Sequence, residues 1–236
     1  MESQNIEWKE SWRDEYLKWI CGFANAQGGR RSWDSTPVPY VSSDDFYRDA
    51  FDVFRKKAVS SKRLTPDDVA GTDNELLQAL KLMEGDYVLR AAVLIFHQDP
   101  ERWCLGLYVK IGYFENDADI LYQDEINGPL VSITDRVMDT IYTKYFKGLI
   151  RYEGLQRIDD YPMPRDVLRE AVLNAVVHKD YSANNPIHIK IYDDKVIIYN
   201  DCQIPSNILP ESLLHGVESK PHNPLIANSS IKCGQL

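Results

Sequence analysis

Long hydrophobic runs are absent from this sequence. The longest apolar stretches are Ala91–Phe96 and the mixed segment Leu105–Phe114, well short of the ~20 residues that cross a bilayer. The first twenty residues are rich in Glu, Lys, Arg and Asp, unlike the apolar centre of a secretory signal. We therefore expect no membrane partner.

Cysteine is scarce and dispersed. The four cysteines, Cys21, Cys104, Cys202 and Cys233, form no CxxC pair. This spacing argues against a structural zinc site and favours a reducing compartment. We expect a cytoplasmic protein.

Positive charge is in deficit, since the formal net charge is −9. A protein whose main task is to grip nucleic acid usually presents a basic face, because neutralising phosphates supplies most of its non-specific affinity. The basic clusters at Arg30-Arg31, 55–57 and Lys62-Arg63 stand beside acidic residues. They are typical of solvated helix surfaces, so the charge argues weakly against DNA binding.

What the sequence does contain is enough apolar material for a substantial core, with 44% hydrophobic and 11% aromatic residues in 236. Three- and four-residue spacing of apolar side chains predicts several helices. They cover residues 5–26, a segment that starts at a Ser43 or Asp44 cap, residues 74–83, residues 130–145, and a helix that opens after Pro162 and Pro164.

Strands are predicted between and after these helices. The continuous apolar run Ala91–Phe96 suits a strand covered on both faces, and Leu105–Phe114 suits a second strand. Residues 187–199 alternate apolar and polar side chains around Asp193-Asp194, which predicts a hairpin. The expected fold class is α+β, a mixed sheet with helices over one face.

One predicted helix carries an unusual polar stripe. In REAVLNAVVHKDY, residues 169–181, the side chains of Glu170, Asn174 and His178 recur every four residues among apolar neighbours. Residues four apart lie one above the other on a helix, so these three form one stripe.

Such a stripe suits nucleotide chemistry. Glu170 could polarise an attacking water, and Asn174 offers a neutral amide oxygen to Mg²⁺, which prefers hard oxygen ligands. An acceptor in the segment after the hairpin, Asn200-Asp201, could take a hydrogen bond from an adenine amino group. Catalysis would then rest on positioning and charge neutralisation.

These segments resemble a known family. REAVLNAVVHKDY is similar to the N-box of the GHKL (Bergerat)-type ATPase module in RecG-like transcriptional regulators. YPMPRDVL before it, VIIYND and IP after it, and RAAVLIFHQDP upstream stand in that family's order. The resemblance covers roughly residues 40–228 and implies a GHKL-like α/β sandwich that binds ATP and Mg²⁺.

The resemblance assigns roles to six residues. Glu170 would be the general base, and Asn174 the Mg²⁺ ligand. Asn200 or Asp201 would contact adenine. His178 and Asp180 would line the rim of the nucleotide pocket.

The N-terminus carries a second resemblance. ESQNIEWKESW followed by GFANAQGG looks like the opening of the AlbA-type DNA-binding domain shared with Schlafen proteins, in which Glu2 and Glu7 match two carboxylates of a nuclease metal site. The strands that follow in that domain have no counterpart before RRSWDSTPVP, so nuclease activity is not expected. We expect residues 1–34 to be a remnant of that domain, and residues 35–236 a helical lead-in with a C-terminally shortened GHKL module.

Two departures weaken the expected nucleotide chemistry. Cys202 stands where the family has Gly, which permits close backbone approach to a ligand. The family's later Gly-x-Gly lid, whose N–H groups would support phosphate, is not found before the sequence ends at SSIKCGQL. The expected enzyme is therefore at most a weak Mg²⁺-dependent ATPase.

Structural explanations remain open beside these roles. Glu170 would suit an exposed helical position, and Asn174 could satisfy a strand end. His178 could close the helix as a partly charged imidazole favoured by the helix dipole, and Asp180 could belong to a turn.

Three functional alternatives also remain open. The preferred function is an ATP-binding transcriptional regulator. The second is a non-enzymatic DNA-binding or interaction module that uses the ATPase-like half as scaffold, and the third is a shortened product without activity. Double-stranded DNA and further copies of the chain are the additional partners that the resemblance leaves open.

Overall fold

The computed structural model of the chain is an α+β fold built on one mixed sheet. The description covers residues 2–7, 32–42, 45–146, 148–153, 156–202 and 221–235, and for 2–7, 149–153 and 156–160 it covers the backbone alone. The main sheet has the strand order β1-β10-β9-β5-β6. Its strands are β1 (Glu2–Glu7), β5 (Tyr108–Phe114), β6 (Ile120–Asn127), β9 (Ile187–Ile191) and β10 (Lys195–Asn200).

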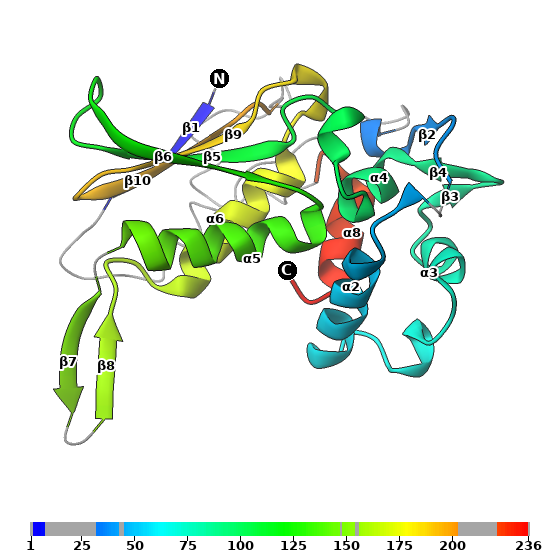
Figure 1. Cartoon of the computed structure of the whole chain (residues 1–236), viewed down its shortest axis with the longest axis horizontal. Helices are drawn as coiled ribbons and strands as arrows, with labels where there is room; N and C mark the ends of the chain where they lie inside the picture. The colour runs from blue at the N-terminus through cyan, green and yellow to red at the C-terminus, as the bar shows by residue number, and fades with distance from the viewer. Residues whose placement is uncertain are drawn as a thin grey trace.

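Only the central pair, β5 and β9, runs parallel, and the other neighbours run antiparallel. Parallel neighbours require a long crossover, which here contains α5 (Leu130–Thr140) and α6 (Arg165–His178). Both helices cover the same face of the sheet (Figure 1). The predicted mixed sheet with helices over one face is confirmed, and the arrangement is consistent with a GHKL-like α/β fold.

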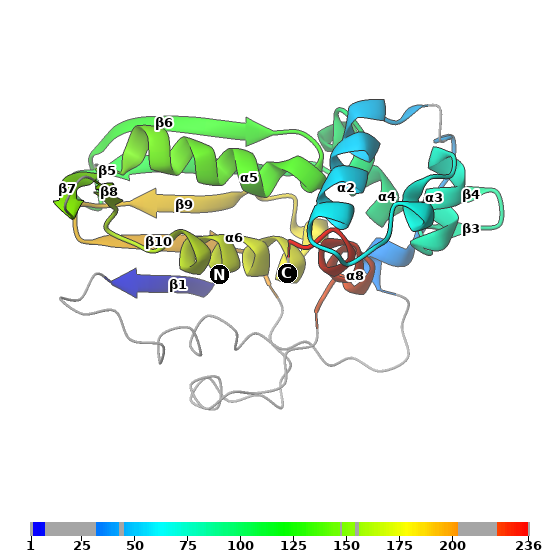
Figure 2. The same ribbon diagram turned by 90° about the horizontal axis from the view of Figure 1, so that it is seen from below.

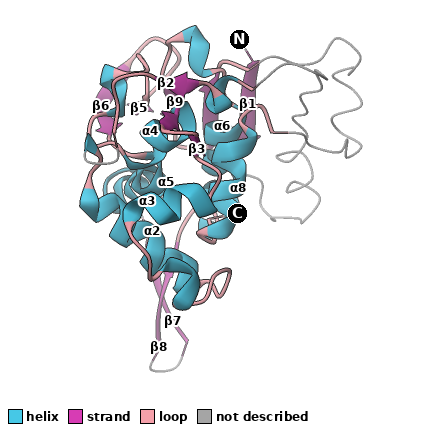
Figure 3. Cartoon of the chain, turned by 90° about the vertical axis from the view of Figure 1, so that its right-hand side faces the viewer, coloured by secondary structure: helices cyan, strands magenta, loops and turns pink. Residues whose placement is uncertain are grey.

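A helical body adjoins one end of the sheet. It contains α2 (Arg48–Ser60), α3 (Asp73–Ala79), α4 (Arg90–Phe96) and α8 (Pro224–Lys232). Figure 2 shows this body beside the sheet, and Figure 3 views it end-on. A small sheet of β2 (Pro37–Val38), β4 (Tyr87–Leu89) and β3 (Met83–Glu84) flanks it.

The hairpin formed by β7 (Leu149–Glu153) and β8 (Gln156–Asp160) projects away from the body (Figure 1). It lies in the connection between α5 and α6. Within the described segments, no helix is long and apolar enough to span a bilayer.

The predicted strand at Ala91–Phe96 is wrong, because these residues belong to α4. Ala91, Ala92 and Leu94 favour helix, and α4 packs against α2, α5 and α8. Its residues from Ala91 to Phe96 are all buried. A helix enclosed on every side is apolar all round, and a short apolar run cannot be told from a covered strand by periodicity.

The predicted helix over residues 5–26 is wrong at its start. Residues 5–7 lie in β1, which pairs with β10 so that Ile6 stands opposite Val196. The remainder of that prediction, residues 8–26, falls outside the described residues, as does the predicted cap at Ser43 or Asp44. The helix predicted for 74–83 is shorter, Asp73–Ala79, and begins with a capping box between Thr72 and Glu75.

Candidate functional site

The polar stripe lies on α6, the helix that the sequence predicts after Pro164. Asp166 occupies its first turn, where a carboxylate is favoured by the helix dipole. The buried side of α6 packs against β10 and α5. Glu170 and Asn174 are half-buried and His178 is buried, so the stripe runs from a partly open flank of the helix into the interior.

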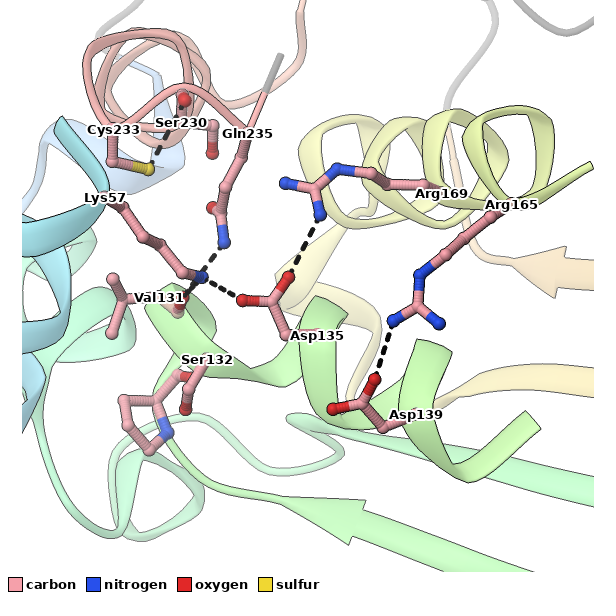
Figure 4. A network of polar contacts seen from close by, with 11 residues as sticks. Lys57, Val131, Ser132, Asp135, Asp139, Arg165, Arg169, Ser230, Cys233 and Gln235 are labelled. Atoms are coloured by element: carbon pink, nitrogen blue, oxygen red, sulfur yellow. Dashed lines mark hydrogen bonds and ion pairs between the residues drawn. The ribbon is translucent and has the colours of Figure 1, made fainter. Parts of the chain in front are cut away.

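Ion pairs hold the N-terminal half of α6 against α5. Arg169 contacts Asp135 at 3.1 Å and Arg165 contacts Asp139 at 2.6 Å. Asp135 also binds Lys57 of α2 at 2.5 Å, so one carboxylate joins three helices (Figure 4). Each partly exposed pair contributes little to stability by itself, but together they fix the rotation of the turn that carries Glu170.

Asn223 caps the C-terminal end of α6. Its Nδ2 donates to the carbonyl oxygens of Val177 at 2.9 Å and Lys179 at 2.8 Å. These are carbonyls that a helix end leaves without intrahelical partners. Asn223 is itself the N-cap residue of α8, so the end of one helix is joined directly to the start of another.

Asp34 secures the start of α8 from a distant part of the chain. Its Oδ2 accepts hydrogen bonds from the backbone N–H groups of Leu225 at 2.8 Å and Ile226 at 3.2 Å. Burial raises the pKa of this fully buried carboxyl, although these bonds and the Ser32 hydroxyl act in the opposite direction. Nothing in the sequence near Asp34 predicts the contact, whereas Asn223-Pro224 has the local pattern of a helix start.

The end of the hairpin meets the end of α6. The Asn200 Nδ2 donates to the carbonyl of Ala175 at 3.2 Å. The backbone N–H of Asp180 donates to the carbonyl of Asp201 at 2.6 Å. Asp201 Oδ2 accepts from Asn185 Nδ2 at 2.8 Å.

Asp180 also organises the turn that follows α6. Its Oδ1 accepts from the backbone N–H of Ser182 at 2.9 Å and from the Ser182 hydroxyl at 2.5 Å. This is the turn chemistry left open by the sequence. Both hydrogen bonds of this turn go to Oδ1 of the buried Asp180 side chain.

The structure thus brings the ends of α6 and β10 together at one corner, through the contacts of Asp180, Asn200 and Asp201. Glu170 lies farther back along α6. His178 is the last residue of α6, beside the corner, and Asn174 lies one turn before it.

Two basic side chains at this corner are buried. Burial lowers the pKa of His178 to about 4, with a smaller contribution from His222. The imidazole is therefore neutral at pH 7, contrary to the alternative in which a partly charged ring ends the helix. Burial also lowers the pKa of Lys179, while Cys104, Asp201 and Asp180 act to raise it.

The donor set fits a nucleotide with Mg²⁺ in its chemistry. Among the described residues, no three His, Cys, Asp or Glu side chains converge as a metal site. Mg²⁺ bound to a nucleotide does not require such a cluster, since it uses one or two protein oxygens together with phosphates and waters. The amide oxygen of a half-buried Asn174 is a ligand of this kind.

The C-terminal part of the chain is similar to a known family. Residues 184–235 match the model of a family described as "Putative ATP-dependent DNA helicase recG C-terminal". The C-terminal part of this chain is ATPase-like. The match includes β9, β10 and α8, and α6 lies outside it.

A solved structure shares the fold. The DIP2311 protein from Corynebacterium diphtheriae is similar with a TM-score of 0.69 and 21% sequence identity. The similarity covers 89% of this chain and 41% of that chain, so this chain spans less than half the length of the other protein. No curated protein matches the sequence.

Proposed function

We propose that this chain binds ATP with Mg²⁺ at the corner where α6 and β10 end. The observation that carries the proposal is that the ends of α6 and β10 meet through the backbone hydrogen bond between Asp180 and Asp201, with the half-buried Asn174 one turn before the end of α6. The ATPase-like match of residues 184–235, which include Asp201, supports it.

The roles follow from the chemistry of each side chain. Asn174 would give its amide oxygen to Mg²⁺, which when bound neutralises phosphate charge. Glu170, one turn earlier, would orient water for a weak hydrolysis. His178 and Asp180 would form the rim of the pocket, where a neutral imidazole can donate or accept a hydrogen bond.

Asp201 suits the adenine contact better than Asn200. Both side chains have an acceptor oxygen, but the Asn200 amide is already held against α6 by the hydrogen bond from its nitrogen to the Ala175 carbonyl. Asp201 uses one carboxylate oxygen for Asn185, which leaves its second oxygen as an acceptor for an adenine amino group. Asp201→Asn should therefore reduce the preference for ATP over GTP.

Thermal unfolding tests the proposal. At a concentration near 100 times Kd, ATP with Mg²⁺ should raise Tm by roughly 5–10 °C, because a ligand that binds only the folded state stabilises it by about 2.7 kcal/mol. Asn174→Ala should lose most of this rise. Glu170→Gln, on the same flank of α6, should keep it, since a residue that acts on water is not needed for binding.

Asn228→Ala is the matched control, because Asn228 is an exposed helical asparagine on α8. An equal rise in wild type and Asn174→Ala, or no rise in either, would contradict the proposed pocket.

We further propose that nucleotide binding serves a RecG-like transcriptional regulator in the cytoplasm. This role, like double-stranded DNA and further copies of the chain as partners, rests on the sequence resemblance. Salt-dependent binding to duplex DNA that responds to ATP would support it. Salt-dependent binding without any nucleotide effect would favour the interaction-module alternative.

A further inference from the structure

A small cavity lies where α5, α6 and α8 meet, behind the polar stripe. About 10 Å³ is open there to the centre of a water molecule, which is about the space that one water requires. Most of the lining is apolar, from Leu130, Leu173, Val176 and Ile226. The lining also includes hydroxyl-bearing residues, among them Thr134 of α5 and Ser229 of α8.

Both hydroxyls are deeply buried and have no hydrogen-bond partner among the described residues. Thr134 is 1% exposed and Ser229 is 2% exposed. A buried hydroxyl without a partner costs roughly 1–3 kcal/mol. Two such groups facing one cavity therefore call for a shared polar ligand.

The hydroxyl of Thr134 lacks a hydrogen bond that later threonines in the chain form. Thr140 donates to the carbonyl of Arg136 at 2.7 Å, and Thr143 donates to the carbonyl of Asp139 at 2.6 Å. This bond to the carbonyl four residues earlier is the usual local solution for a helical threonine. Thr134 does not make it, so its hydroxyl remains available to the cavity.

We propose that this cavity binds one internal water molecule, held between the Thr134 and Ser229 hydroxyls. A water both donates and accepts hydrogen bonds, and buried waters typically make about three. Ser230 and Gln235 line the same cavity and offer further polar atoms. The Gln235 amide already joins the carbonyl of Val131 at 2.9 Å (Figure 4), which anchors the segment after α8 to α5.

The bound water joins α5 to α8 directly behind α6. Leu173 and Val176, on α6, form part of its enclosure, and Leu173 is the neighbour of Asn174 in the chain. The site is independent of the proposed nucleotide function, because it requires neither ATP nor Mg²⁺.

The direction in which two substitutions change the unfolding equilibrium constant tests the proposal. With a bridging water, Thr134→Val and Ser229→Ala should each increase the unfolding equilibrium constant by about 2- to 10-fold, because each removes a hydrogen bond to the water. The double variant should fall short of the product of the two single effects, because both residues share one ligand. Urea unfolding of the full chain measures all three variants.

Direct detection complements the stability measurement. An NMR cross-peak from a long-lived water to the Val176 methyl groups, which line the cavity in every variant, is expected in wild type and should be lost in the double variant. Thr140→Val, on the same helix but half-buried, away from the cavity lining and with its own carbonyl partner, is the matched control and should keep the cross-peak.

A decrease in the unfolding equilibrium constant of these variants would overturn the proposal. If the two hydroxyls are unpaired, Thr134→Val and Ser229→Ala each remove an uncompensated polar group and should lower the unfolding constant. Effects that multiply independently, or a wild-type spectrum without the water cross-peak, would also contradict a shared water.

Discussion

Phe96→Ala should lower the free energy of unfolding by about 3–5 kcal/mol, the usual cost of removing a fully buried phenylalanine. Phe96 is the last residue of α4 and is completely buried. Its ring stacks on Phe51 with centroids 4.2 Å apart and meets Phe54 edge-on at 5.7 Å. Urea unfolding measures the effect.

A double-mutant cycle separates the ring contact from simple burial. Phe51 and Phe96 should show a coupling of about 0.5–1.5 kcal/mol beyond their separate effects. Tyr87→Ala is the control, because this aromatic side chain is 57% exposed and should change stability little. A loss below about 1 kcal/mol for Phe96→Ala would contradict the position of α4 in the core.

Acid should destabilise the protein through His178. The pKa of His178 is about 4 in the folded chain, below the ordinary value of about 6.5, because burial disfavours the charged ring. The stabilisation is fully present above pH 6.5 and is lost as the pH falls from 6.5 to 4. The expected loss is about 3 kcal/mol in the free energy of unfolding.

His178→Gln isolates this contribution, since other titrating groups are common to both proteins. The free energy of unfolding should fall less steeply in the variant than in wild type between pH 6.5 and 4, as followed by urea unfolding at several pH values. Parallel curves would show that His178 titrates at its ordinary pKa. His222→Gln should keep most of the wild-type fall in the free energy of unfolding between pH 6.5 and 4, because His222 makes only the smaller contribution to the lowered pKa of His178.

The elements with strong local patterns could be predicted from the sequence. Alternation on both sides of Asp193-Asp194 predicts the β9–β10 hairpin, and its register pairs Val196 with Ile191. The helix after Pro164 follows from its spacing and its first-turn aspartate.

The elements that depend on distant partners could not be predicted in this way. β6 exposes Ile120, Leu121 and Tyr122, so its side chains lack the alternation that marks a half-buried strand. α4 is a short apolar run surrounded by other helices. The periodicity of a run of this length does not distinguish a buried helix from a buried strand.

Some residues of the candidate site could also be predicted from local sequence patterns, and others could not. The spacing of Glu170, Asn174 and His178 is visible in the sequence because a helix has a fixed period. Asp34 and Asn223 fix the ends of α6 and α8 through contacts between segments far apart in the chain. No local pattern reports such contacts, so the residues that support the corner emerge only from the fold.

A crystal structure with Mg²⁺ and a non-hydrolysable ATP analogue tests the central claim most directly. We expect Mg²⁺ bound to the Asn174 amide oxygen at about 2.0–2.1 Å, with the adenine amino group donating to Asp201. A nucleotide bound elsewhere on the chain, or a complex in which Asn174 contacts neither Mg²⁺ nor phosphate, would contradict it.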